Sequence, residues 1–251
     1  MRGKNDTLLE ERAHVLLDSA REQAVPMRLL GGMGIRVLLG EDMDARFHRE
    51  IADLDFLTTR RAGRAVEDLL QSAGWQPERQ FNALNGTRRL LFADSESGQK
   101  IDVFVETFEM CHKLPLAERL ALVEATLPAA ELAMTKLQIV SLNPKDRGDL
   151  YALLHGLDVA DHDDRAINAT RIAELTRGDW GLHHTVELNL ERLREGLLES
   201  LLDAEERTLT LKRISALEHA IEQAPKSRSW RMRARIGERR PWYEEPEEVD
   251  R

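Results

Sequence analysis

The sequence predicts an α+β protein in which a mixed region of strands and helices, to about residue 156, is followed by a C-terminal helical region. Leu and Ala dominate the composition and aromatic residues make up only 5%, which favours helices over an all-β fold. Segments that alternate polar and apolar residues, as half-buried strands do, occur before residue 106. Beyond residue 163, apolar residues recur at helical spacing and strand signals are absent.

The first part of the chain is expected to mix helices with strands. The predicted helices span residues 7–23, 33–39, 61–73, 130–142 and 146–154. The predicted strands span residues 27–30, 53–57 and 100–105. Residues 75–92 are expected to hold one or two further strands, with a hairpin turn at Asn85-Gly86, because Asn-Gly is a strong hairpin signal.

The second part is expected to be helical. Its predicted helices span residues 164–176, 186–202 and 204–223. The last residues are first basic and then acidic, which is typical of a mobile tail. The predicted organisation is therefore an α/β domain over 1–156, a helical domain over 157–226 and a mobile charged tail over 227–251. The helices over 130–156 could pack on either of the first two parts.

Charge and composition exclude several classes of protein. The formal net charge of −9 excludes a global basic field that would attract nucleic acid or an anionic membrane. Cys111 is the single cysteine, so no internal disulfide can form and no structural zinc site can rest on cysteines. No stretch approaches the roughly 20 apolar residues of a membrane span, and the N-terminus lacks the apolar core of a signal peptide. We therefore expect a cytoplasmic protein without a membrane partner.

Three aspartates on predicted strands are the main candidates for a metal site. Asp53 and Asp55 are two residues apart, so their side chains project from one face of a strand, with backbones about 7 Å apart. Asp102 lies in another strand, where Ile101 and Val103 would face the core. Like charges held close together require cations to neutralise them, and carboxylate oxygens suit Mg²⁺. The alternative is that all three are solvated residues of a half-exposed sheet.

A Gly-Gly pair marks the other end of the candidate site. Gly31-Gly32 follows a short apolar run and precedes a predicted helix. Backbone amides at a helix N-terminus attract phosphate, and the missing side chains allow it to approach closely. A simple tight turn is the alternative. The order of a strand, Gly-Gly, a helix, an acidic strand and a further strand with a single Asp favours a site for nucleotide phosphate and metal ions.

This order resembles the nucleotidyltransferase fold of the DNA polymerase beta superfamily, which implies a mixed sheet with flanking helices. Members carry a Gly-Gly or Gly-Ser turn before a strand with two aspartates, and a third carboxylate on a later strand. The corresponding residues here are Gly31-Gly32, Asp53-Leu54-Asp55 and Asp102. The turn reads Gly-Gly-Met-Gly, without the Ser that often touches a phosphate in the family, so backbone amides would bind the phosphate instead.

Two branches of that superfamily share further motifs with this chain. The run GGMGIRVLLG followed by ARFH resembles the small antibiotic nucleotidyltransferases. The later part resembles abortive-infection type nucleotidyltransferase toxins, which carry a Lys-x-Asp strand, a helix with Lys-Leu and a basic-Asp-x-x-Asp element. These are matched by Lys100-Ile101-Asp102, Lys136-Leu137 and Lys145-Asp146 with Asp149. The resemblance covers about residues 29–154.

The resemblance implies a role for each candidate residue. The implied catalytic residues and metal ligands are Asp53, Asp55 and Asp102. The implied nucleotide-binding residues are Gly31, Gly32, Arg49, Lys136 and Asp149. Lys136 lies among core-facing positions of a predicted helix, where a lysine is costly unless it is paired or reaches a cleft. A lysine that snorkels to the surface is the alternative, and Asp149 could either pair with Lys136 or serve the site.

The activity implied by the resemblance is nucleotidyl transfer that depends on Mg²⁺. A nucleoside monophosphate would move from a nucleoside triphosphate to an acceptor hydroxyl, on RNA, on protein or on a small molecule. The alternative is a non-catalytic relative that keeps the fold as a binding or regulatory module. A member of a toxin–antitoxin pair, with an antitoxin partner, would be an example.

Overall fold

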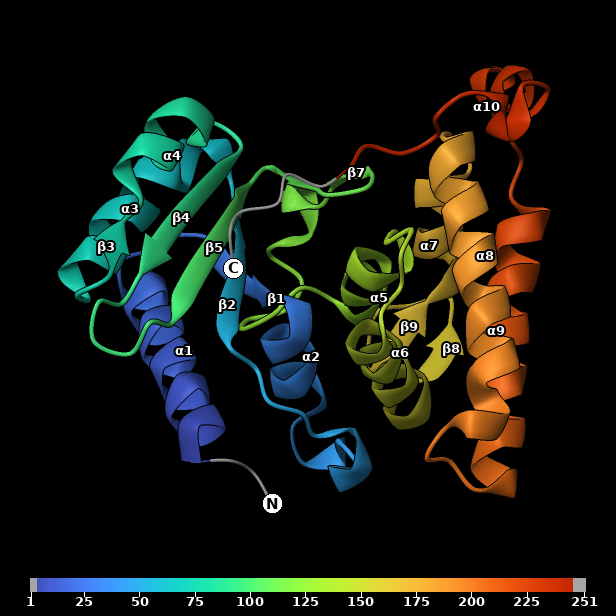
Figure 1. Ribbon diagram of the computed structural model, residues 1–251, viewed down its shortest axis with the longest axis horizontal. Coiled ribbons are helices and arrows are strands. Elements are labelled where there is room, and N and C mark those ends of the chain that lie inside the picture. Colours follow the sequence, from blue (N-terminus) through green and yellow to red (C-terminus); the bar gives the residue numbers. More distant parts are fainter. Residues whose placement is uncertain (1–3, 246–251) are drawn as a thin grey trace. The chain divides into compact units, whose positions relative to one another are not determined.

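The computed structural model describes residues 4–245 and divides into two compact units (Figure 1). Unit 1 takes the residues up to Glu41, then His48–Phe108 and Pro115–Pro128. Unit 2 takes Asp42–Phe47, Glu109–Leu114 and the residues from Ala129 onward. The helices between residues 129 and 156, which the sequence left open between the two parts, belong to unit 2.

A five-stranded mixed sheet forms the centre of unit 1. Its strands are β1 (Met27–Leu30), β2 (Asp53–Thr58), β3 (Gln76–Pro77), β4 (Arg89–Ala93) and β5 (Lys100–Val105). They follow the order β1-β2-β5-β4-β3. The pair β2 and β5 is parallel and the other pairs are antiparallel, so the two predicted acidic strands lie side by side. The α+β class and the mixed sheet predicted from the sequence are confirmed.

One face of this sheet is apolar and packs with α1 (Lys4–Glu22) and α3 (Gly63–Ser72) in a single core cluster. The fully buried strand residues in that cluster include Leu54, Phe56, Ile101 and Val103. Successive strand residues point to opposite faces. Asp53, Asp55 and Asp102 are therefore on the other face, where they keep partial exposure. This agrees with the alternation that the sequence predicted.

The Gly-Gly pair opens a helix, as expected. The helix α2 (Gly31–Leu39) starts directly after β1, two residues earlier than predicted, and ends at Gly40. The predicted helix over 61–73 is divided in the structure. Its first turn is a 3-10 helix, Arg60–Ala62, and α3 follows from Gly63.

The prediction of a hairpin turn at Asn85-Gly86 was wrong. A short helix, α4 (Arg79–Asn85), lies between β3 and β4, and Gly86 keeps a helical conformation with φ −59° and ψ −13°. A type I′ turn needs positive φ at both central residues. The Asn82 side chain favours the helix because its Nδ2 donates to the Leu91 carbonyl at 3.1 Å and its Oδ1 accepts from the Leu91 amide at 2.7 Å. This tertiary contact overrides the local turn signal.

Unit 2 is mainly helical. Its helices are α5 (Ala129–Leu137), α6 (Pro144–Gly156), α7 (Ala169–Thr176), α8 (Trp180–Gly196), α9 (Ala204–Gln223) and α10 (Arg228–Ala234). The predicted absence of strands beyond residue 163 was wrong. A parallel pair, β8 (Asp158–Ala160) and β9 (Ala166–Asn168), precedes α7. A strand of three residues is too short to show an alternating pattern, so no local signal predicted β9.

The segment predicted to be a mobile tail carries ordered structure in its described part. The helix α10 starts at the cap Ser227, whose hydroxyl accepts from the Trp230 amide at 3.0 Å. Farther along, Trp242 Nε1 donates to Thr185 Oγ1 on α8 at 3.2 Å. Residues 246–251, the acidic end of the predicted tail, lie outside the described residues.

Two short strands, β6 (Thr107–Glu109) and β7 (Lys113–Pro115), pair as a ribbon. Among residues 4–245, no helix combines the length and the apolar character needed to cross a bilayer.

Candidate active site

The three predicted carboxylates meet on one face of the sheet in unit 1. Asp55 of β2 and Asp102 of β5 are register partners, and Asp53 is one pleat away on the same face. Neighbouring strands lie about 4.8 Å apart, so Asp55 and Asp102 hold two negative charges close together. Lys100 stands opposite Asp53 in the same register. We call Asp53, Asp55 and Asp102 the acidic face.

An arginine of the neighbouring strand binds the third carboxylate. Arg89 of β4 donates from Nε to Asp102 Oδ1 at 2.9 Å and to Oδ2 at 3.0 Å, and its Nη2 also contacts Oδ2. The guanidinium carbon lies 5.0 Å from the centre of the Phe104 ring. Both partners of the ion pair are largely shielded, with side chains 17% and 14% exposed. Charge-assisted contacts of this kind are strong and offset the negative charge of Asp102.

Sequence reasoning missed Arg89, although a signal was present. Leu90 and Phe92 are buried on the apolar face, and Arg89 has the opposite parity along β4. Alternation therefore places Arg89 on the same side as Asp102. The sequence does not show that β4 pairs with β5, which is what brings the two side chains together.

Gly31 brings the start of α2 against Asp55. Its φ of +66° lies in the left-handed region that favours glycine. A Cβ at this position would lie 2.1 Å from Asp55 Oδ2, closer than any real contact. A carboxylate at a helix N-terminus interacts favourably with the helix dipole. Both the backbone conformation and the neighbouring carboxylate therefore favour a glycine at position 31.

Gly32 is equally close to a basic side chain. A Cβ on Gly32 would lie 2.3 Å from Arg49 Nη2, so Arg49 also stands at the start of α2. The segment that carries Arg49 is held by Arg36 of α2, which is 1% exposed and donates from Nη2 to the Arg49 carbonyl. The structure therefore brings the predicted residues Gly31, Gly32, Arg49 and Asp55 together. No sequence pattern predicted the role of Arg36.

Lys136 and Asp149, predicted to bind nucleotide, form a buried ion cluster in unit 2. Lys136 Nζ lies 2.6 Å from Asp146 Oδ1 and 3.0 Å from Asp149 Oδ2. Burial acts to lower the pKa of Lys136, but the charges and hydrogen bonds of Asp149 and Asp146 outweigh it and raise that pKa. Lys136 is only 9% exposed, so it does not snorkel to the surface. Its role in nucleotide binding stays a prediction.

The neighbouring residues fix this cluster on α6. Asn143 caps the helix through its Oδ1, which accepts from the Asp146 amide at 2.9 Å, and its Nδ2 donates to Asp146 Oδ2 at 2.6 Å. Asp146 is therefore not the cap itself. Its carboxylate is held between Asn143 and Lys136, which leaves the ammonium charge well paired.

Lys136→Met is expected to lower the free energy of unfolding by about 3 to 5 kcal/mol, because it leaves two carboxylates without their buried cation. Urea unfolding at pH 7 measures this loss. Lys145→Met, which changes an exposed lysine in the first turn of α6, serves as the control and should change stability by less than about 0.5 kcal/mol. Because folding raises the pKa of Lys136, the stability that its charge contributes is complete below about pH 10 and is lost only at higher pH. Equal losses of stability from Lys136→Met and Lys145→Met would contradict the ion pairing of Lys136 with Asp146 and Asp149.

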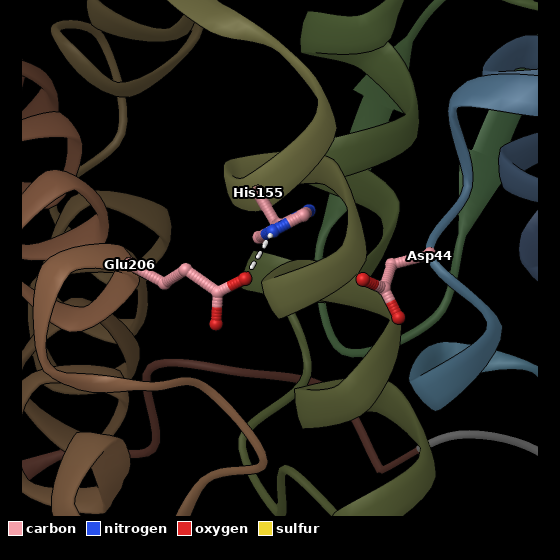
Figure 2. A group of neighbouring side chains, drawn as sticks. All are labelled: Asp44, His155 and Glu206. Atoms are coloured by element: carbon pink, nitrogen blue, oxygen red, sulfur yellow. Dashed lines mark hydrogen bonds and ion pairs between the residues drawn. The ribbon is translucent and has the colours of Figure 1, made fainter.

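A second polar cluster in unit 2 offers ligand atoms for a cation. Asp44, His155 of α6 and Glu206 of α9 each present one such atom, all within 4.8 Å of one another (Figure 2). His155 Nε2 lies 3.1 Å from Glu206 Oε1. Arg46, however, binds both carboxylates, at 2.7 Å from Asp44 Oδ2 and 2.5 Å from Glu206 Oε1. The arginine already supplies the positive charge, so this cluster is an ion-pair network joining residues 42–47 to α6 and α9.

The Glu206 ion pair should make stability depend on pH in the acid range. The Arg46 side chain, followed by the Asp203 amide, lowers the pKa of Glu206 to about 2. A carboxylate whose pKa is lowered by folding stabilises the folded state at pH values above its pKa in the unfolded chain, about 4.3. This stabilisation is lost as the pH falls toward 2. The melting temperature of wild type minus that of Glu206→Gln should therefore be largest above pH 5 and shrink toward pH 2. Glu205→Gln, an exposed neighbour, should show no such trend.

Comparisons with known proteins find similarity to solved structures. No protein-family model matches the chain, and no curated protein matches it. The solution structure of the antibiotic-resistance factor ANT(2'')-Ia is similar over 85% of this chain and 97% of that chain, with 14% sequence identity and a TM-score of 0.39.

Proposed function

We propose that this chain is a magnesium-dependent nucleotidyltransferase, which moves a nucleoside monophosphate from a nucleoside triphosphate to an acceptor hydroxyl. The observation that carries the proposal is the acidic face together with the start of α2. Asp55 and Asp102 are register partners, Asp53 shares their face, and Gly31 brings the first turn of α2 against Asp55. Carboxylates in such proximity favour a bound cation, and the start of a helix favours a phosphate.

The donor set fits Mg²⁺, which prefers oxygen ligands. Asp53 and Asp55 would hold the ion that accompanies the triphosphate, and Asp102 would contribute to a second ion. When bound, Mg²⁺ neutralises the triphosphate and polarises the phosphoryl group under attack. Arg89 already contacts Asp102, so ion binding at Asp102 would require this guanidinium to shift or to remain as an outer partner.

The chain's own residues would bind and orient the reactants. The Gly31 and Gly32 amides and the Arg49 guanidinium would hold the phosphates, since all three stand at the start of α2. The Asp102 carboxylate would accept the proton of the acceptor hydroxyl. The hydroxyl oxygen would then bond to the α-phosphorus, the bond from that phosphorus to the bridging oxygen would break, and pyrophosphate would leave.

Transfer of label from the α-phosphate tests this proposal. Purified protein, Mg²⁺ and each nucleoside triphosphate would be incubated with separate RNA, protein and small-molecule fractions of a cell extract. We expect label in one fraction with wild type, at least a hundredfold less with Asp53→Asn, and full transfer with Asp68→Asn. Asp68 is an exposed carboxylate on α3 away from the acidic face, so it controls for the loss of a charge. Absence of label from every fraction with wild type would reject the proposal.

A non-catalytic binding or regulatory module is the second candidate. The ion pair between Arg89 and Asp102 favours it, because a carboxylate neutralised by the protein itself has less need of a metal. The thermal response distinguishes the candidates. An enzyme of the proposed kind should gain several degrees in melting temperature from Mg²⁺ and nucleoside triphosphate together. A module in which Arg89 permanently replaces the metal should gain nothing from Mg²⁺.

A further inference from the structure

A second polar site lies in unit 1, in a pocket of about 510 Å³ formed by α3, α4 and the ends of β4 and β5. Pockets of this size hold small molecules. Of its strand residues, Leu90 and Val105 belong to the apolar face of the sheet. They point away from Asp102, and none of the aspartates of the acidic face lines the pocket. The pocket is therefore distinct from the candidate active site.

The charge of this pocket is positive in a chain that is acidic overall. Arg60, Arg64 and Arg79 line it, with Glu67 as the one carboxylate among the lining residues. Within residues 4–245, the three guanidinium groups form no ion pair or hydrogen bond with another side chain. Three cations face one carboxylate in the lining, so the pocket keeps a net positive charge that an anion would neutralise. This contrasts with Arg46 and Arg89, which are both bound to carboxylates.

Specific contacts around Asn82 and Gly86 fix one wall of the pocket. The Asn82 side chain holds α4 to the Leu91 backbone through one donated and one accepted hydrogen bond, which sets the position of one side of the pocket. Gly86 lies so close to this helix that a Cβ would stand 2.5 Å from the Asn82 carbonyl oxygen. Gly86, which the sequence marked as part of a turn, thus lines the pocket instead.

We propose that this pocket binds the phosphoryl groups of a small, multiply charged anion. Guanidinium groups pair with phosphate oxygens in a bidentate geometry, and three of them suit a short chain of phosphates. The lining contains no aromatic side chain, so the pocket offers nothing for a base to stack on. Recognition rests on the phosphates, whether they belong to inorganic polyphosphate or to a nucleotide.

The test uses calorimetric titration of the full chain with inorganic triphosphate in EDTA, where magnesium-dependent binding at the acidic face is absent. We expect binding by wild type, and binding weakened about tenfold by Arg64→Gln or Arg79→Gln. Arg61→Gln removes an exposed arginine next to the pocket that does not line it, so binding should be unchanged. Glu67→Gln should strengthen binding by about two- to threefold, which a mere structural disturbance would not do.

Two further titrations distinguish a free polyphosphate ligand from a nucleotide and this pocket from the acidic face. A nucleoside triphosphate in EDTA should bind as tightly as inorganic triphosphate if the ligand is free polyphosphate, and more tightly if it is a nucleotide. Asp53→Asn should bind inorganic triphosphate in EDTA as wild type does, so the result is independent of the proposed enzyme activity. No binding by wild type, equal weakening by Arg61→Gln, or loss of binding in Asp53→Asn would each overturn the proposal.

Discussion

Gly31→Ala should lower the free energy of unfolding by about 3 to 4 kcal/mol, the largest effect of any glycine substitution in the sheet unit. The left-handed conformation at φ +66° costs an alanine about 1 to 2 kcal/mol. The new Cβ would also stand 2.1 Å from Asp55 Oδ2, which forces the carboxylate or α2 to move and costs about 2 kcal/mol more. Urea unfolding followed by circular dichroism measures the total.

Gly98→Ala is the matched control for Gly31. Gly98 has a similar φ of +71°, but a Cβ there would meet nothing within 4 Å. Its substitution should therefore cost only the backbone contribution, about 1 to 2 kcal/mol. Combining Gly31→Ala with Asp55→Ala should recover part of the loss, whereas Gly98→Ala and Asp55→Ala should add independently. Equal costs at Gly31 and Gly98 would mean that Asp55 does not crowd the start of α2.

Arg89→Gln should lower the free energy of unfolding by about 2 to 3 kcal/mol, because the mostly buried Asp102 would lose its cation beside Asp55. Arg88→Gln, an exposed neighbour, should cost less than about 0.5 kcal/mol. The double variant Arg89→Gln with Asp102→Asn should regain part of the stability. Urea unfolding of wild type, Arg89→Gln, Asp102→Asn and the double variant gives the coupling between the two residues.

Magnesium adds a second outcome to the same experiment. If the acidic face holds Mg²⁺, the ion should raise the melting temperature of Arg89→Gln more than that of wild type, since it replaces the missing positive charge. If Arg89 is simply a structural partner and no metal binds, Mg²⁺ will leave the difference between the two proteins unchanged. This result would favour the non-catalytic module.

The strands that carry the acidic face could be predicted because their signal is local. In β2 and β5, acidic residues alternate with fully buried apolar ones, and this pattern fixes which face each side chain takes. The Gly-Gly pair was likewise informative, because the position of Gly31 needs a residue without a side chain. The parallel register that aligns Asp55 with Asp102 depends on the sheet order, which no local pattern contains.

The features that sequence reasoning missed all depend on contacts between distant segments. The ion pair of Arg89 with Asp102 requires the pairing of β4 with β5. The helix α4 forms where a hairpin was predicted because Asn82 binds the backbone of β4. The network around Arg46 joins residues 155 and 206 to a segment more than 100 positions earlier. The secondary-structure propensity of a single segment does not predict such contacts.

Magnesium-dependent binding of a non-hydrolysable nucleoside triphosphate tests the central claim most directly. Calorimetric titration would compare wild type, Asp53→Asn and the control Asp68→Asn, each with Mg²⁺ and with EDTA. The proposed site predicts that Mg²⁺ adds a binding event that is present in wild type and Asp68→Asn and weakened at least tenfold in Asp53→Asn. Equal magnesium-dependent binding by wild type and Asp53→Asn, or no such binding of any nucleotide, would contradict a metal and nucleotide site on the acidic face.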